Sequence, residues 1–233
     1  STTGIAKGES LKDVGEMMNH YGDVVVLRDS NSDAIYDMLE SLRIPIINAG
    51  NGTDEHPTQA LADMFAIFKW RPQLMAEEVA DKDKIRIAII GHPARMRTVR
   101  SLLLLLSRFS NALHEVVIIC NAKEPFSEGQ REELEKEGHK IRVTNDMDEE
   151  LPQMDIVYIN AITWVGNSYE EHGLEYKLSI DSPLKKGAII LHPLARGEEL
   201  STDLDDTDHN WYFAQARGAV FIRMALMSSI VRF

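Results

Sequence analysis

The chain has 233 residues, of which 44% are hydrophobic and 27% charged, as expected of a globular protein with one large or two modest domains. Its formal net charge of −12 argues against general nucleic-acid binding, although a few arginines can still form a local site for a small anion. The single cysteine, Cys120, excludes an internal disulfide framework and fits a reducing, cytoplasmic location, and no apolar run reaches the roughly 20 residues of a membrane span.

Helices are predicted where apolar residues recur at helical spacing behind a capping residue or a proline. The first has a serine cap, and the third has Pro57 at a favourable first-turn position. The predicted helices are 10–22, 33–43, 56–71, 97–109, 127–138 and a closing segment, 211–233, of one or two helices.

Short apolar runs between these helices predict buried strands. The runs are 23–29, 44–50, 85–91, 114–121, 140–145, 154–160 and 187–193. Strands that alternate with helices imply right-handed crossover units and a mainly parallel sheet, so we predict an α/β fold. The best place for a domain boundary is the polar stretch around residues 70–84.

Histidines and arginines gather directly after the predicted strands. One of them is Arg28, and the others occur in the turn "GNGTDEHPTQ", in "GHPARMRT" and in "HPLAR". Ligands of parallel α/β folds bind where strands end and helices begin. The pattern therefore predicts a site for an anion at this edge.

Ordinary explanations exist for each of these residues. Arg28 could pair with Asp29 or Asp33, and isolated histidines usually lie in turns or at the surface. Arg97, however, begins a helix, where a cation opposes the helix dipole unless an anion binds there. At the start of its own helix His56 is expected to stay neutral and to act as a hydrogen-bond donor.

Competing nucleotide and hydrolase motifs do not fit. The segment "IRIAIIGHPARMRTVRS" has the strand, first glycine and helix of a dinucleotide site, but it lacks the second and third glycines. A P-loop, a zinc-ligand spacing and a G-x-S-x-G elbow are also absent from the sequence.

The segment "NAGNGTDEHPTQAL" resembles the His-Pro-Thr-Gln motif of the aspartate/ornithine carbamoyltransferases, in the version of the aspartate branch. Further matches follow in the same order along nearly the whole chain: "KGESLKD", "VVVLRDS", "GHPARMRTVRSL", "LHPLARGEEL" and "TDLDDTDHNWYFAQARGAVFIRMAL". The resemblance implies two doubly wound parallel-sheet subdomains, the N-terminal one incomplete. It implies a partial carbamoyl-phosphate domain at 1–70, an amino-acid domain at 71–216 and a helix at 217–233 that packs back on the first domain.

The resemblance also implies roles on the carbamoyl side of the site. Arg28 matches the arginine that grips carbamoyl phosphate. His56 and Gln59 match the pair that hydrogen-bonds the carbamoyl group, at its carbonyl oxygen and amide nitrogen respectively. Lys7 and Thr3 match a loop that reaches into a neighbouring subunit's active site.

On the acceptor side, Arg97 with Thr98 matches the group that holds the α-carboxylate of the amino acid. Pro193 and Leu194 match the backbone carbonyls that orient the substrate. The resemblance further implies a homotrimer with shared sites, acting on carbamoyl phosphate and an amino-acid acceptor without a metal, a cofactor or a covalent intermediate.

Three departures from the family pattern bear on these expectations. The Ser-Thr-Arg-Thr phosphate loop belongs upstream of the match to Lys7, so we expect either an N-terminally truncated sequence or an incomplete phosphate site. Ala161 stands where the aspartate branch has an arginine for the second carboxylate. Ala195 replaces a proline whose preceding peptide bond is cis in the family.

These departures concern the acceptor and the phosphate and spare His56 and Gln59. The sequence thus favours an aspartate carbamoyltransferase or a relative with another acceptor, with pyrimidine biosynthesis implied if the acceptor is aspartate. The alternative is a catalytically inactive paralogue with an assembly role.

Overall fold

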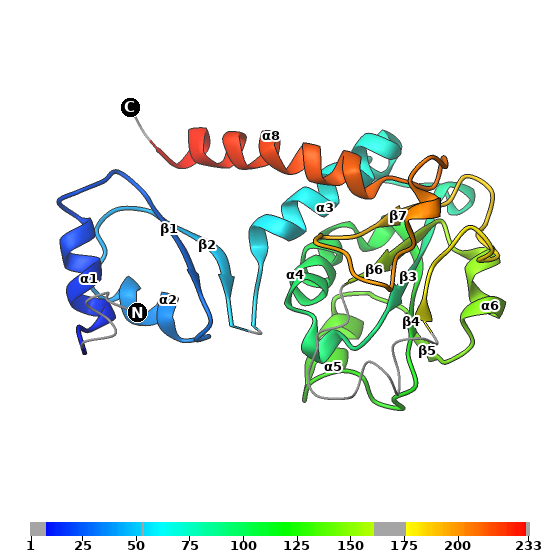
Figure 1. Cartoon of the computed structure of the whole chain (residues 1–233), viewed down its shortest axis with the longest axis horizontal. Coiled ribbons are helices and arrows are strands. Elements are labelled where there is room, and N and C mark those ends of the chain that lie inside the picture. Colours follow the sequence, from blue (N-terminus) through cyan, green and yellow to red (C-terminus); the bar gives the residue numbers. More distant parts are fainter. Residues whose placement is uncertain (1–7, 53, 161–175, 232–233) are drawn as a thin grey trace.

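A five-stranded parallel sheet and a two-stranded parallel sheet form the α/β fold, in a computed structural model that describes residues 8–52, 54–160 and 176–231 (Figure 1). The strands are β1 (Val25–Asp29), β2 (Ile46–Asn51), β3 (Ile85–Ile90), β4 (Leu113–Ile119), β5 (Ile141–Thr144), β6 (Ile156–Ile159) and β7 (Ile189–Leu191). The strand order in the larger sheet is β5-β4-β3-β6-β7, and every paired strand in both sheets is parallel. The predicted α/β class with parallel strands is confirmed.

Apart from α6, which the sequence did not predict, the α-helices begin close to the predicted signals. They are α1 (Leu11–Met18), α2 (Ala34–Leu39), α3 (Pro57–Trp70), α4 (Arg97–Leu106), α5 (Gln130–Lys136), α6 (Met147–Glu150) and α8 (Tyr212–Ile230). The hydroxyl of Ser10 caps α1 by accepting from the Asp13 backbone N–H at 3.1 Å. Pro57 is the first residue of α3, where its missing N–H has no partner to lose.

Short 3₁₀ turns complete the connections. They are Pro72–Met75, Asp81–Asp83, Pro93–Arg95, Ser107–Ala112, Leu151–Gln153 and Thr202–Leu204. The predicted helix 97–109 ends early as an α-helix, because Phe109 has a non-helical backbone with φ −128°. In the described part of the chain, no helix combines the length and the apolar character needed to cross a bilayer.

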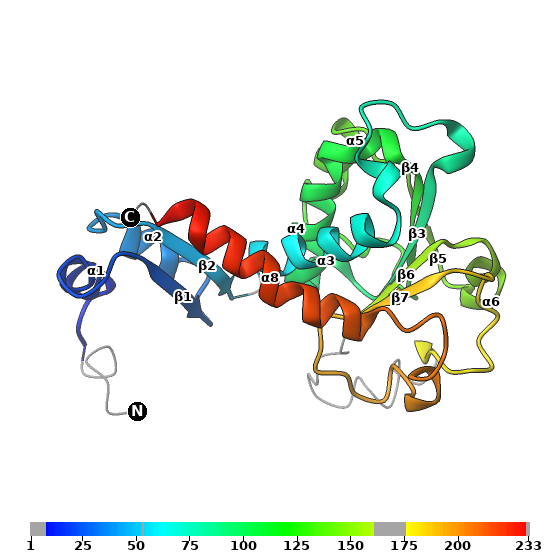
Figure 2. The ribbon, with the colours of Figure 1, turned by 90° about the horizontal axis from the view of Figure 1, so that it is seen from above.

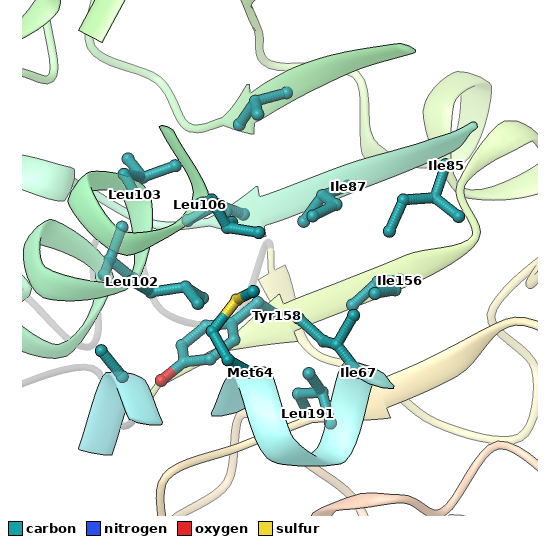
Figure 3. Packing of buried hydrophobic residues seen from close by; sticks show 14 of the residues in the cluster. Met64, Ile67, Ile85, Ile87, Leu102, Leu103, Leu106, Ile156, Tyr158 and Leu191 are labelled. Atoms are coloured by element: carbon teal, nitrogen blue, oxygen red, sulfur yellow. The ribbon is translucent and has the colours of Figure 1, made fainter. Parts of the chain in front are cut away.

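Two apolar cores cover the two faces of the five-stranded sheet. Alternate residues of β3, such as Ile87 and Ala88, belong to different cores because successive side chains of a strand point to opposite faces. The core on one face joins β3, β6 and β7 to α3 and α4, and Figure 3 shows Met64 and Ile67 of α3 beside Tyr158 of β6. The site residues at the starts of α3 and α4 are therefore carried by a well-packed support.

The long helix α8 connects the two sheets. It runs along α3 from the five-stranded sheet toward β1 and β2 (Figures 1 and 2). Gly218 allows the close approach, since a Cβ atom there would lie 2.6 Å from Cδ1 of Phe65 on α3. Farther along α8, the charge of Arg223 reaches His56 at the start of α3.

Candidate active site

His56 lies at the start of α3, directly after the turn that follows β2. Its backbone N–H donates to Oγ of Ser101 on α4 at 2.8 Å, and the Ser101 hydroxyl donates to the Glu55 carboxylate. Arg100 pairs with the same carboxylate at 3.0 Å. Helix α4 thus fixes the backbone from which the imidazole projects, without using the ring itself.

The His56 ring is held neutral. Burial is the main cause that lowers its pKa to about 4, and the positive charges of Arg97, Arg28 and Arg223 contribute to the same shift. Its Nδ1 is buried and has no hydrogen-bond partner among the residues that the structure describes. A neutral imidazole keeps one N–H donor, and three guanidinium groups nearby make the surroundings favourable for an anion.

Acidification should therefore weaken the fold through His56. Because its folded-state pKa of about 4 is below the ordinary 6.5, its contribution to stability is complete above pH 6.5 and is lost as the pH falls toward 4. We expect the free energy of unfolding, measured by urea titration, to fall less steeply over this range in His56→Gln than in the wild type. The exposed His114→Gln is the matched control, and equal slopes in all three proteins would contradict the assigned pKa shift.

Arg97 begins α4 and packs against the turn after β2. Its Nη1 donates to the backbone oxygen of Gly52 at 2.6 Å. Gly50 has φ 117°, and a Cβ atom at this position would lie 3.4 Å from the guanidinium carbon of Arg97. The glycine turn therefore serves to admit the guanidinium, and burial together with the charge of Arg28 lowers the pKa of Arg97.

Gln59 and Thr98 are each held by a specific side chain. Gln59 is buried, and its Nε2 donates to Oδ1 of Asp63 at 2.7 Å. Thr98 accepts from Nδ2 of Asn160, the residue after β6, at 3.1 Å. Both side chains lie at the first turn of their helices, close to His56 and Arg97 in the chain.

The segment after β7 is organised by His192. The ring Nδ1 of His192 accepts from the backbone N–H of Leu194 at 2.8 Å, and its Nε2 lies 2.9 Å from Oε1 of Glu199. Leu194 has φ 58°, and the peptide bond between Leu194 and Ala195 is cis. His192 and Glu199 thus fix the backbone path of Pro193 and Leu194.

Of the residues singled out in the sequence, the structure brings Arg28, His56 and Arg97 within electrostatic reach of one another. Arg28 is near the end of β1, and its side chain is exposed. Lys7, Thr3 and Ala161 lie outside the described residues.

Sequence reasoning missed Arg223 and Asp63. Arg223 is a cation with the apolar neighbours Ile222 and Met224 in the second half of α8, and its charge reaches His56. Asp63 is a carboxylate on the buried face of α3, four residues after Gln59. In both cases the available signal was a charged residue on a helix whose neighbours are apolar.

The fold and the site define a class of protein: an α/β protein that places cations and a neutral imidazole together near its strand ends, where ligands of parallel α/β folds bind. No cluster of three or more metal-binding side chains occurs among the described residues. A family model described as the aspartate/ornithine carbamoyltransferase carbamoyl-P binding domain matches residues 1–69, and one described as the Asp/Orn binding domain matches residues 83–230. The chain belongs to the aspartate/ornithine carbamoyltransferase family, as its motifs predicted.

Similar proteins agree with this assignment. The aspartate carbamoyltransferase catalytic subunit of Korarchaeum cryptofilum is 34% identical over 236 residues, which cover 99% of this chain and 75% of that protein. The chloroplastic aspartate carbamoyltransferase of Arabidopsis thaliana is 33% identical over 233 residues, covering 97% and 57% respectively.

Solved structures show the same similarity. Aspartate transcarbamoylase from Trypanosoma cruzi in complex with carbamoyl aspartate and phosphate matches with a TM-score of 0.88 and 33% identity, over 99% of this chain and 73% of that chain. The same enzyme in complex with N-(phosphonacetyl)-L-aspartic acid matches with a TM-score of 0.84 and 34% identity, over 99% and 71%.

Proposed function

We propose that the chain is an aspartate carbamoyltransferase, which transfers the carbamoyl group of carbamoyl phosphate to the amine of aspartate in pyrimidine biosynthesis. The observation that carries the proposal is the neutral His56 imidazole among Arg97, Arg28 and Arg223. Structural similarity to an enzyme solved with carbamoyl phosphate and aspartate together supports both substrates.

In the proposed reaction the amine nitrogen of aspartate attacks the carbamoyl carbon. The bond from that carbon to the bridging phosphate oxygen breaks, and phosphate leaves with the proton that the amine loses. Negative charge grows on the carbamoyl oxygen during attack, and the His56 N–H stabilises it. No nucleophilic side chain takes part, since the protein acts by holding the two substrates together and by electrostatic stabilisation.

The remaining roles divide between the two substrates. Arg28 binds the phosphate, Gln59 accepts from the carbamoyl amide, and Arg97 with Thr98 holds the α-carboxylate of aspartate. The backbone carbonyls of Pro193 and Leu194 orient the substrates.

Assembly and domain division are part of the same proposal. Lys7 and Thr3 complete a neighbouring subunit's site in a homotrimer. Residues 1–70 bind carbamoyl phosphate, 71–216 bind the amino acid, and 217–233 pack back on the first domain. The single cysteine supports a cytoplasmic location.

Phosphate release from carbamoyl phosphate in the presence of a panel of amines tests the function. We expect aspartate to be the best acceptor, with little release from ornithine, which lacks the side-chain carboxylate. Faster release with another amine would support the alternative acceptor that Ala161 suggests. Absence of release with every amine would favour a non-catalytic paralogue.

A further inference from the structure

A buried carboxylate lies directly behind the proposed carbamoyl site. Asp63 on α3 has no exposed surface, and it accepts hydrogen bonds from three neutral groups. Nε2 of Gln59 lies 2.7 Å from Oδ1, Nε2 of Gln215 lies 2.5 Å from the same oxygen, and the Tyr158 hydroxyl lies 3.1 Å from Oδ2. These donors come from α3, α8 and β6, so one carboxylate joins three elements.

This arrangement does not favour the stability of the fold. Burying a carboxylate removes its hydration, and Asp63 forms no ion pair within the described residues. Burial raises its pKa, and the net value is about 6 because the hydrogen bonds from Gln215, Gln59 and Tyr158 and the charge of Arg223 act in the opposite direction. The group is therefore ionised at neutral pH, although a well-packed apolar residue would serve the core at least as well.

The carboxylate fixes which end of the Gln59 amide faces the site. An ionised carboxylate can only accept hydrogen bonds, so the NH₂ of Gln59 must face Asp63. Its carbonyl oxygen, Oε1, is then directed away from Asp63 and available to accept an N–H bond. A neutral residue that could also donate would allow the amide to rotate and present the wrong group.

The same carboxylate fixes a second amide. Nε2 of Gln215 faces Asp63, so its Oε1 is available on the other side and accepts from the backbone N–H of His192 at 2.8 Å. Gln215 and His192 are both buried, each with 1% of its surface exposed. His192 leads directly into Pro193 and Leu194.

We propose that Asp63 is a positioning residue that orients Gln59 toward the carbamoyl amide and, through Gln215, holds the backbone at His192 on the acceptor side. This inference rests on the proposed function, because it takes the ligand of Gln59 to be a carbamoyl NH₂. It assigns one buried charge to the alignment of both substrates, which reach the site from different parts of the fold.

The test compares Asp63→Asn with the wild type in binding of carbamoyl phosphate and of inorganic phosphate by calorimetry. Asparagine keeps the volume but can donate to either glutamine, so the orientation of Gln59 is no longer unique. We expect affinity for carbamoyl phosphate to fall about tenfold or more, as for loss of one hydrogen bond in a buried site. Affinity for inorganic phosphate, which has no amide, should stay within about twofold.

Asp155→Asn is the matched control. Asp155 is also a buried carboxylate, but it lies at the opposite end of β6, where it pairs with Lys185 at 2.8 Å and Arg71 at 3.3 Å. Its replacement should lower stability and leave the ratio of the two affinities unchanged. The same unchanged ratio in Asp63→Asn would overturn the proposal.

Two further variants separate the arms of the network. In a Gln59→Ala background, Asp63→Asn should have no additional effect on carbamoyl phosphate affinity, because Asp63 acts through Gln59. If Asp63→Asn does not fold, Gln215→Met tests the proposal instead. This variant should raise the KM for aspartate severalfold and leave the affinity for carbamoyl phosphate unchanged. An unchanged KM for aspartate would overturn the proposal. Failure of the wild type to carbamoylate aspartate would refute the proposed function instead, while the affinity ratio would still test Asp63.

Discussion

His56→Ala is expected to lower kcat by about two to three powers of ten, the usual effect of removing one donor to a developing oxyanion. The free energy of unfolding should change by less than about 1 kcal/mol, as for substitutions outside the core. The backbone N–H of His56 keeps its bond to Ser101, and the ring Nδ1 has no partner among the described residues to lose. Steady-state kinetics and urea unfolding measure the two effects separately.

His139→Ala is the control and should give the opposite pattern. The ring Nε2 of His139 lies 2.9 Å from both the Leu103 carbonyl oxygen and the Ser107 hydroxyl, and only 4% of the residue is exposed. Its removal should cost about 1–3 kcal/mol of stability and leave kcat of the folded enzyme unchanged. Equal losses of folding and activity in His56→Ala would contradict its proposed role.

Arg97→Leu is expected to lower kcat/KM for aspartate by about a hundredfold or more, since removing one partner of a hydrogen-bonded charge pair costs about 2–5 kcal/mol. The loss should appear mainly as a raised KM for aspartate, because the carboxylate is bound before and during the reaction. Arg97→Lys keeps the charge without the planar guanidinium group, so its kcat/KM for aspartate should lie between those of the wild type and Arg97→Leu. Initial rates at saturating carbamoyl phosphate measure the effect.

Arg86→Leu controls for the loss of a guanidinium group elsewhere. Arg86 lies in β3 near its opposite end and pairs with Glu115 at 3.0 Å. Its loss should leave the KM for aspartate unchanged. A similar rise in both variants would indicate a general effect on the fold, and no rise in Arg97→Leu would contradict the assignment of the α-carboxylate.

Much of the fold was predictable from local patterns. The strands β3, β4 and β6 are nearly continuous apolar runs, as expected for a parallel sheet covered on both faces. Helix α3 is marked by Pro57 and by its apolar spacing. Such signals depend on neighbours in the sequence, so they can be recognised without knowledge of tertiary contacts.

The buried face of α8 could not be predicted in the same way. Phe213, Val220 and Phe221 are exposed although they are apolar, so hydrophobic spacing does not identify the face that packs on α3. That face is set by Gln215, Gly218 and Ala219, which are polar or small. Their role depends on contacts with α3, far away in the sequence.

The site was predictable where a motif carries it and not where distant polar groups meet. His56 and Gln59 stand together in one motif at a helix start. The bonds from Gln215 and Tyr158 to Asp63 join residues 152 and 95 positions apart, and no periodicity in the sequence indicates such a meeting. The order of the strands could not be predicted from local patterns either, because it follows from the packing of the whole sheet.

The most direct test of the central claim is the ¹³C resonance of carbonyl-labelled carbamoyl phosphate bound to the protein. A neutral imidazole that donates to the carbamoyl oxygen polarises the C=O bond, so the bound resonance of the wild type should lie downfield of the free ligand. In His56→Ala this displacement should largely disappear while phosphate still binds. The same downfield displacement in both proteins would show that another group polarises the carbonyl and would contradict the role of His56.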